Sequence, residues 1–424
     1  FEDFLWGYIG APLILILGFY YGFKSRFVQF RKFHVVMKEF YYYMWVYPRN
    51  VNGVHPLKVF FACVGGCIGI GNMVGITSAI QIGGPGALFW VWVTGIAGVM
   101  LKYAEVYLGV RYRVSIPGKG YKGGPMYFLR HAYKGAFFPL FVCFLLAIYG
   151  VEIYQFRVVT KSLVYNFGLN EYAVVVLLLG LVLYAVSGGV NRVGEISSMT
   201  IPLFIFLFVG MGLWIILLNI NAIPGLIQDV FVSAFTGKAA TGGFLGSTIM
   251  VGMSQGARRG AYSGDVGIGY ASVIHSETSV TIPEKQASLV IFDIFLDTFV
   301  ICTMSIVIVL LTGVWHSGVP AECLVQTALS VYFPYMHYFM PFFIFLLGYS
   351  TIIAYFVVGL NCAQYLSPKW GKSVFYLYAI TAFVIFSFAE TRQALSVMAI
   401  IGCLLLIINC YGIFKLTRDI RFDF

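Results

Sequence analysis

Charged side chains are scarce in this chain. Its 424 residues include 27 Lys and Arg and 17 Asp and Glu, so that 10% of the residues are charged. About a quarter of the residues of a soluble globular protein are charged, and this shortage excludes an ordinary soluble domain. In their place, 60% of the residues are hydrophobic and the mean hydropathy is +0.87. The composition predicts a polytopic membrane protein.

The sequence also lacks the motifs of common enzymes. Its six histidines form no His-Glu-x-x-His pair, and no glycine run has the strand or the Gly-Lys-Ser/Thr of a nucleotide site. The eight cysteines show no zinc-like spacing with histidine and fall mostly inside apolar runs, so we expect no disulfide. No serine or cysteine has a recognisable triad context. We therefore predict that the protein is not an enzyme and needs no cofactor other than a coupling ion.

Long apolar runs are abundant. A membrane-spanning helix needs about 20 apolar residues, whereas barrel strands are shorter and alternate. The runs predict an all-α protein with eleven transmembrane helices: Phe4–Phe23, Leu57–Ile80, Ala87–Val110, Phe137–Val158, Tyr172–Ser187, Ile201–Ile220, Gly243–Gly256 with its flanks, Gln286–Thr312, Pro334–Leu360, Ser373–Phe388 and Ala394–Leu416.

The net charge of +10 is distributed unevenly. Most basic residues fall in connections that share one side of the membrane if the first run enters from outside, and we count Arg258 and Arg259 among these inner residues. The other side keeps only Arg157, Lys161, Lys238 and Arg392. By the positive-inside rule the N-terminus is outside and the C-terminus inside, in a bacterial cytoplasmic membrane. The basic balance thus describes topology and not a nucleic-acid partner.

Two apolar runs contain clusters of glycine. Residues 65–75 include five glycines and Asn72, and a second interrupted segment is expected from Thr241 to Gly260. Glycine costs about 1 kcal/mol relative to alanine inside a helix, so such clusters predict broken helices. Broken helices at corresponding places in two halves indicate a transporter site at the membrane midplane.

The two broken runs are the second and the seventh, and an offset of five reverses their direction. This order predicts one extra N-terminal helix followed by an inverted repeat of five plus five helices, as in LeuT-like transporters. We expect a single transporter domain over residues 1–424, with the extra helix and a basic connection in 1–56, the first repeat in 57–221 and the second in 222–424.

With these residues in view, the chain resembles the alanine or glycine:cation symporter family, the sodium:alanine symporters. The resemblance is densest between Gly69 and Arg113, with Gly-Ile-Gly-Asn-Met-Val-Gly, Gly-Gly-Pro-Gly-Ala-Leu-Phe-Trp and Lys-Tyr-Ala-Glu-Val. Further matches are Gly-Gly-Pro-Met-Tyr at 123–127, Gly-Gly-Phe at 242–244, Asp297-Thr298 and Ser350-Thr351. The resemblance implies sodium-coupled uptake of alanine or glycine, and of D-alanine in some members.

A small zwitterion needs donors for its carboxylate and acceptors for its ammonium group, and broken helices expose both. We predict that backbone amides around Gly71–Gly75 bind the carboxylate, and that the Asn72 amide binds sodium or substrate unless it only caps the half-helix. Pocket residues are expected from segment seven and elsewhere: Phe244, Gly246, Thr248, Met250, Gln155 and Tyr355. Ser350 and Thr351 lie where LeuT-like transporters place hydroxyl ligands for sodium, although such hydroxyls often bond their own helix.

Acidic residues inside apolar runs are unusual. A carboxylate within a membrane helix costs about 2.5–3.5 kcal/mol and is functional by default. Glu152 is therefore either a pocket residue or the partner of Arg157 in an ion pair near the outer surface. Asp293 and Asp297 either pair with inner-face arginines such as Arg258 or Arg259, the interpretation we favour, or bind an ion. Proton coupling through Glu152, or a non-transporting amino-acid receptor on the same scaffold, are the alternatives to a sodium:amino-acid symporter.

Overall fold

The computed structural model describes residues 4–48, 52–118, 120–236, 248–388 and 391–424, with the backbone alone described for 248–250, 261–262 and 391–395. The chain is almost entirely helical. The elements of the first half are η1 (Leu5–Gly10), α2 (Ala11–Lys24), α3 (Val28–Arg31), α4 (Phe33–Trp45), α5 (Pro56–Cys67), η2 (Ile70–Asn72), α6 (Val74–Gly83), α7 (Ala87–Arg111), β1 (Val114–Ile116), β2 (Gly120–Lys122), α8 (Pro125–Tyr133), α9 (Phe137–Tyr149), α10 (Ile153–Phe167), α11 (Glu171–Val186) and α12 (Gly189–Leu218). Those of the second half are η3 (Ile220–Ala222), α13 (Ile223–Thr236), α14 (Thr248–Ser263), α15 (Tyr270–Ser276), α16 (Pro283–Ile294), η4 (Phe295–Cys302), α17 (Thr303–Thr312), η5 (Val314–His316), η6 (Ala321–Cys323), α18 (Leu324–Ser330), α19 (Met336–Leu366), α20 (Gly371–Phe388), α21 (Thr391–Lys415) and η7 (Thr417–Asp419).

Most of the expected apolar runs form membrane-length helices. Among the described residues, eight helices are long and apolar enough to cross a membrane, and a ninth span is formed if the bent pair α5 and α6 counts as one. The two remaining runs correspond to α11 and α14, which have 16 residues each. A mostly helical polytopic protein is therefore confirmed, whereas the count of eleven spans stays a prediction.

The first predicted break is confirmed. Helix α5 ends at Cys67, a short 3₁₀ turn follows, and α6 continues from Val74 at an angle of 57° to α5. The glycines at 65–75 lie in the last turn of α5, in this turn and at the start of α6. The cluster thus marks the place where the segment comes apart.

The second break lies further along the chain than expected. Residues 248–260 of the interval Thr241–Gly260 form one continuous helix, α14, so this part of the prediction is wrong; residues 241–247 lie outside the described residues. The interruption spans Gly264 to Gly269, between α14 and α15. Its glycines are required by the backbone, because Gly267 and Gly269 have φ of +76° and +102°. Isolated glycines inside α14 serve close packing instead, since a Cβ on Gly256 would lie 2.4 Å from the Ala87 carbonyl oxygen.

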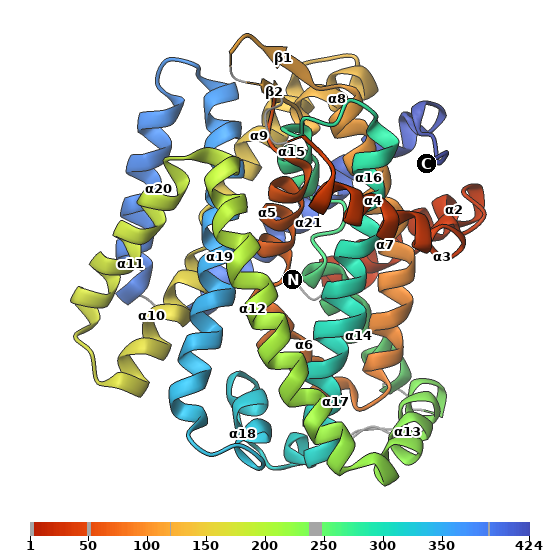
Figure 1. The fold of residues 1–424 in the computed structure, drawn as a ribbon, viewed down its shortest axis with the longest axis vertical. Coiled ribbons are helices and arrows are strands. Elements are labelled where there is room, and N and C mark those ends of the chain that lie inside the picture. The colour runs from red at the N-terminus through yellow and green to blue at the C-terminus, as the bar shows by residue number, and fades with distance from the viewer. Residues whose placement is uncertain (1–3, 49–51, 119, 237–247, 389–390) are drawn as a thin grey trace.

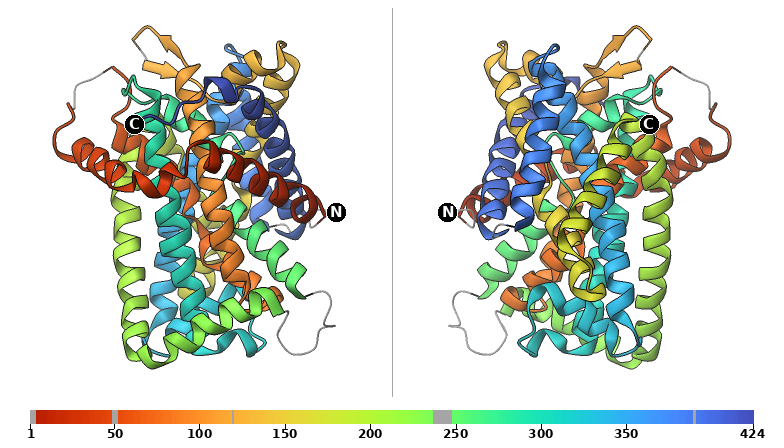
Figure 2. Two further views of the ribbon diagram at one scale, coloured as in Figure 1. Left: turned by 90° about the vertical axis from the view of Figure 1, so that its right-hand side faces the viewer. Right: turned by 90° about the vertical axis from the view of Figure 1, so that its left-hand side faces the viewer.

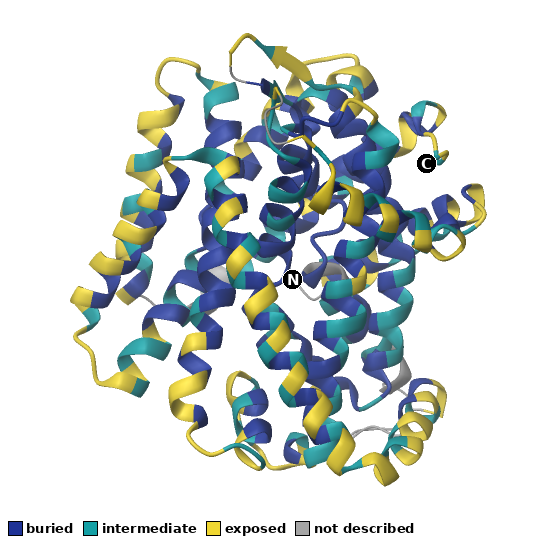
Figure 3. Ribbon diagram, in the orientation of Figure 1, coloured by how far each residue is buried: buried dark blue, intermediate teal, exposed yellow. Residues whose placement is uncertain are grey.

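The broken helices lie in the middle of the bundle (Figures 1 and 2). Helices α5 and α12 pack together, α19 lies against both, and α6 packs against α14. Residues near the centre are buried, whereas α11, α12 and α20 expose large hydrophobic side chains along their outer faces (Figure 3). Exposed hydrophobic side chains on the outer faces are expected for a helix bundle whose outer surface is covered by lipid.

The two ends of the bundle differ. One carries β1 and β2, which pair antiparallel, and the other carries α13 and α18; we call them the hairpin end and the α18 end (Figure 1). At the hairpin end the Arg113 guanidinium donates to the carbonyl oxygens of Ser276 at 3.1 Å, Thr278 at 2.6 Å and Val280 at 2.8 Å, and lies over the ring of Tyr121. This Arg113 clamp holds the chain that follows α15 against the end of α7.

Candidate functional site

Side chains of the break itself and of α10 and α19 bind the backbone groups that the first break frees. The amide of Gly69 donates to the Asn72 Oδ1 at 3.0 Å, and the amide of Ile70 donates to the Gln155 Oε1 at 3.3 Å. On the other side, the Thr351 hydroxyl donates to the Gly65 carbonyl oxygen at 3.1 Å. Irregular backbone at membrane depth requires such partners, so α10 and α19 stabilise the break.

Asn72 joins the two breaks through a cluster of four hydrogen-bonded polar side chains. Its Nδ2 donates to the Asp297 Oδ1 at 2.5 Å and to the Ser263 Oγ at 3.0 Å. The Ser263 and Thr298 hydroxyls also donate to the Asp297 carboxylate, at 3.0 and 2.9 Å. All four side chains are buried. Ser263 is the last residue of α14, so the cluster connects the turn after α5 with the end of α14.

The acidic member of this cluster comes from an irregular helix. Asp297 and Thr298 lie in η4, a π-helical stretch within the segment formed by α16, η4 and α17. π-helical turns are rare in proteins, and those that occur are often found at functional sites. The wider turn changes which side chains lie on the same face of the helix. Here it presents both polar residues to the centre of the bundle.

The two hydroxyls of α19 have different partners. The Ser350 hydroxyl donates only to the Leu347 carbonyl oxygen of its own helix, at 2.9 Å. The Thr351 hydroxyl reaches both its own helix, at Leu347, and the carbonyl of Gly65. Of the two predicted sodium ligands, Thr351 is thus the one placed at the break.

A small cavity lies where these elements meet, with a volume of about 30 Å³. A buried water needs roughly 10–15 Å³ of such space, so the cavity holds only a few atoms in this conformation. Its walls come from both breaks and from α10 and α19: Gly66, Cys67, Gly69, Gly71, Asn72, Tyr149, Glu152, Gln155, Ser263, Asp265, Thr351 and Tyr355. The wall therefore combines exposed backbone, two carboxyl groups and several hydroxyls.

Two features of this wall are suited to a polar ligand. The Tyr355 hydroxyl is buried and has no hydrogen-bond partner among the described residues, and its ring stacks on Tyr270 at 4.2 Å. A Cβ on Gly71 would meet no atom within 4 Å, so the backbone there is open to a ligand. A buried polar group without a partner is costly, and a bound substrate can supply the missing contact.

A larger hollow of about 230 Å³ shares Gly71, Gln155 and Ser263 with the small cavity. Its other walls include Gly75, Tyr154, Arg259 and Glu322, close to α18. The small cavity and the larger hollow are thus neighbours, and the larger hollow lies toward the α18 end.

The structure brings together Gly71, Asn72, Glu152, Gln155, Thr351 and Tyr355 in the cavity wall. Two other predicted residues lie elsewhere: Gly75 lines the larger hollow, and Ser350 lines neither space. Phe244 and Gly246 lie outside the described residues, and of Thr248 and Met250 only the backbone, at the start of α14, is described.

The expected arginine partners of Asp293 and Asp297 are wrong, and the structure decides between the two interpretations of Glu152. Asp293 pairs with Lys102 at 2.6 Å, and Asp297 binds Asn72, so neither has the expected arginine partner. Arg157 donates to the carbonyl oxygens of Phe386 and Ser387, which leaves Glu152 as a cavity residue.

Arg258 and Arg259 do not lie in a connection, contrary to expectation. Both lie within α14 and line the larger hollow together with Glu322. The reason is the displaced second break: α14 continues through these arginines, so they belong to a helix and not to the connection after it.

Sequence reasoning missed Ser263, Asp265 and Tyr149. Ser263 and Asp265 are adjacent to the displaced second break, and their role would have followed from placing that break at 264–269. Asp265 has a φ of +49°, an uncommon conformation outside glycine, in the middle of the interruption. Nothing in the sequence around Tyr149 distinguishes it from other aromatic residues at helix ends.

Residues of both interrupted helices line one buried polar cavity, an arrangement typical of the LeuT-like fold. The fold comparison agrees: 84% of the chain aligns with 76% of a solved manganese transporter from Eremococcus coleocola, with a TM-score of 0.51 and 13% identity. This similarity concerns the fold alone.

The chain belongs to the sodium:alanine symporter family, whose sequence profile matches residues 1–421. It is 31% identical over 435 residues to the uncharacterized transporter YflA of Bacillus subtilis, covering 99% of this chain and 90% of the relative. It is 29% identical to the probable sodium/glutamine symporter GlnT of the same organism, covering 98% and 87%. It is 26% identical to the sodium/alanine symporter AgcS of Methanococcus maripaludis, covering 96% and 93%. The chain is thus an integral membrane protein of a transporter family, several of whose members are named as amino-acid carriers.

Proposed function

We propose that the protein is a secondary active symporter that imports a small neutral amino acid, alanine (including D-alanine) or glycine, together with sodium. The observation that carries this proposal is the cavity where the two breaks meet. Its wall places hydrogen-bond donors of the backbone and acceptors of carboxyl groups only a few atoms apart. The small volume favours a substrate with few heavy atoms. The relative named as a sodium/alanine symporter supports the same substrate class. The relative named as a probable sodium/glutamine symporter has a comparable identity to this chain, so the choice of alanine or glycine rests on the small cavity.

The cavity can bind both charged ends of an amino acid. The open backbone at Gly71 stands at the start of the second half-helix, where free amides and the positive end of the helix dipole favour a carboxylate. Glu152 and Asp265 lie in the same wall and can accept from an ammonium group. The Tyr355 hydroxyl has no hydrogen-bond partner within 3.5 Å among the described residues and can bind either end.

We infer two places for sodium. The first is the pair of Ser263 and Asp297 beside Asn72, because carboxylate and hydroxyl oxygens are ligands of hard cations. A cation there would replace the amide hydrogens of Asn72 as the partner of Asp297. The second is the contact of Thr351 with the Gly65 carbonyl, at the C-terminal and negative end of α5. Sodium at either place orders the break that the substrate then uses, which makes the two ligands bind cooperatively.

Proton coupling is the second candidate, and Glu152 is the observation that favours it. This carboxyl group is 5% exposed, precedes α10 at an interruption of its segment and forms no ion pair with a described residue. A buried acid of this kind can carry a proton through the transport cycle. The sodium proposal rests on more contacts, and one experiment distinguishes the two.

The test is uptake of radiolabelled L-alanine, D-alanine and glycine into proteoliposomes, driven by a sodium gradient or by a proton gradient alone. We expect uptake that requires sodium and is lost in Asp297→Asn. Uptake that is driven by protons and abolished by Glu152→Gln would replace sodium by protons. No uptake of any of the three substrates by folded protein under either gradient would refute the substrate assignment.

We further propose that the chain is oriented with its N-terminus outside and its C-terminus inside the cytoplasmic membrane, and that residues 57–221 and 222–424 are inverted repeats. The two breaks, one between α5 and α6 and one between α14 and α15, support this assignment. The hairpin end is then the inner end. Labelling of single cysteines placed in the hairpin and near α18 with a membrane-impermeant reagent tests the orientation.

A further inference from the structure

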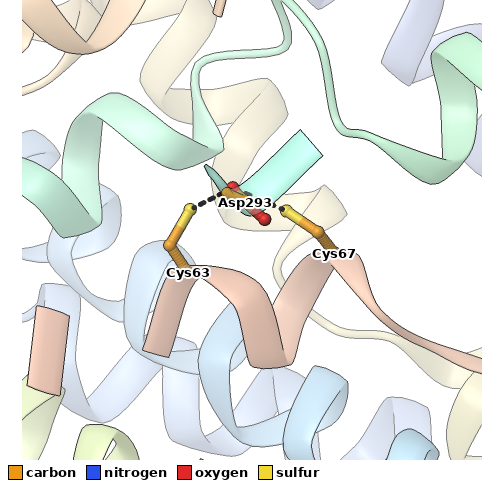
Figure 4. A group of neighbouring side chains, drawn as sticks. All are labelled: Cys63, Cys67 and Asp293. Carbon is orange, nitrogen blue, oxygen red and sulfur yellow. Dashed lines mark hydrogen bonds between the residues drawn. The ribbon is translucent and has the colours of Figure 1, made fainter. Parts of the chain in front are cut away.

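Two cysteines and an aspartate form a compact cluster behind the first break. Cys63 and Cys67 lie one turn apart on α5, and both point toward Asp293 of α16 (Figure 4). The two Sγ atoms lie 3.6 and 4.0 Å from the Asp293 Oδ2, and the three potential ligand atoms lie within 4.8 Å of one another. All three residues are buried and both thiols are free. The proposed transport function uses none of these side chains.

The cluster contains a charge and an unsatisfied oxygen. The Lys102 ammonium donates to the Asp293 Oδ2 at 2.6 Å, to the Cys67 Sγ at 3.0 Å and to the Gly264 carbonyl at 2.9 Å. The second carboxylate oxygen, Asp293 Oδ1, is buried and has no hydrogen-bond partner among the described residues. Asp293 thus has a free oxygen that can hold Lys102 while Oδ2 binds something else.

We propose that Cys63, Cys67 and Asp293 form a binding site for a soft divalent cation such as Cd²⁺ or Zn²⁺. Thiolate sulfur is the preferred ligand of these ions, and a carboxylate oxygen is an accepted additional ligand. Binding replaces two thiol protons by one dication: M²⁺ plus two Cys-SH gives M(S-Cys)₂ plus two H⁺. The charge of the cluster, including Lys102 and Asp293, is zero before and after the exchange. This neutrality matters because an uncompensated charge in a buried site is strongly unfavourable.

The site is connected to the transport pathway, because Cys67 also lines the small cavity. A metal ion that enters through the larger hollow from the α18 end therefore reaches the cluster past the site where the substrate would bind. Once bound, it fixes the last turn of α5 to α16. Since the break next to Cys67 must rearrange during alternating access, occupancy inhibits transport. Only this last consequence rests on the proposed function.

Metal binding is tested on purified protein in detergent, independently of uptake. Titration with Cd²⁺ is followed by the thiolate-to-cadmium charge-transfer absorbance, and calorimetry in buffers of different ionisation enthalpy counts the protons released. We expect one Cd²⁺ bound and two protons released per chain. The variant Cys63→Ser/Cys67→Ser should lose the absorbance and weaken Cd²⁺ binding by more than the 10- to 100-fold that loss of an outer-shell contact produces.

The chain offers a matched control in Cys143 and Cys362, a second pair of buried, neighbouring thiols. The variant Cys143→Ser/Cys362→Ser should keep the Cd²⁺ signal, and Mg²⁺ should give none. Single variants at Cys63 and Cys67, checked for wild-type thermal stability, keep the test valid if the double variant does not fold. A cadmium signal that survives in folded Cys63→Ser/Cys67→Ser, or that disappears in the control, would overturn the proposal. If Cd²⁺ binds as expected but wild-type uptake is unaffected by it, the site stands and its inhibitory role is refuted.

Discussion

Asn72→Ala is the change that most directly tests the proposed sodium site. The side chain accepts from the Gly69 amide and donates to the Asp297 carboxylate and the Ser263 hydroxyl. Its removal therefore affects the shape of the first break and the hydrogen bonds of the Asp297 carboxylate at once. Alanine supplies no acceptor for the freed Gly69 amide.

The contacts give the size of the effect. The contact with the Gly69 amide is worth about 1 kcal/mol and remains when a cation replaces the Asn72 amide hydrogens at Asp297. Since 1.4 kcal/mol is a factor of ten, its loss should lower the apparent sodium affinity about fivefold.

The assay is sodium-dependent alanine uptake into proteoliposomes at several sodium concentrations. If Asn72 acts through sodium, saturating sodium should restore the KM for alanine, because the coupling between two ligands is reciprocal. Thr77→Val on the same half-helix is the control, since the Thr77 hydroxyl bonds only its own helix, to Met73 and Val74. An unchanged sodium dependence would refute the reasoning, and an alanine KM that stays raised at all sodium concentrations would make Asn72 a substrate ligand.

Three further predictions follow from single contacts. Thr351→Val should weaken sodium activation of uptake about fivefold, the equivalent of one hydrogen bond of about 1 kcal/mol, whereas Ser350→Ala should leave it within about twofold; equal effects would contradict the assignment of Thr351 to the break. Gly66→Ala places a Cβ 1.8 Å from the Tyr270 Oη, so overpacking of about 1–3 kcal/mol should lower the thermal stability in detergent, and an unchanged unfolding temperature would show that the ring moves freely. Lys102→Met leaves a buried carboxylate without its cation and should destabilise the protein by about 3–5 kcal/mol, measured as loss of folded protein on heating; adding a neutral substitution of that carboxylate should recover part of the loss.

The sequence predicts the helices of this fold well because each needs about 20 apolar residues, a signal that lipid imposes on the whole segment. The first break was equally accessible, since glycines and one asparagine occur together at 65–75 and the structure interrupts the helix there. The second break was misplaced because glycine has two uses. Gly252, Gly256 and Gly260 lie within a continuous helix, where they allow close packing against α6 and α7, and the glycines at 264–269 provide the irregular backbone.

The candidate site was predictable only where polarity interrupts an apolar run. Asn72, Glu152, Gln155 and Thr351 stand out in this way, and all four line the cavity. Pairings could not be predicted, because they depend on which helices become neighbours. Asp293 and Lys102 are 191 positions apart in the sequence, and their contact follows from the packing of α16 against α7.

The Arg113 clamp bears on how fast the protein can work. In this conformation the larger hollow beside the cavity lies toward the α18 end, while three carbonyl oxygens and an aromatic ring hold the chain after α15 at the hairpin end through one guanidinium group. Under the proposed transport function, with cargo released at the hairpin end, we expect these contacts to break together in every cycle. The lifetime of the clamp would then set an upper limit on the number of substrates delivered per second.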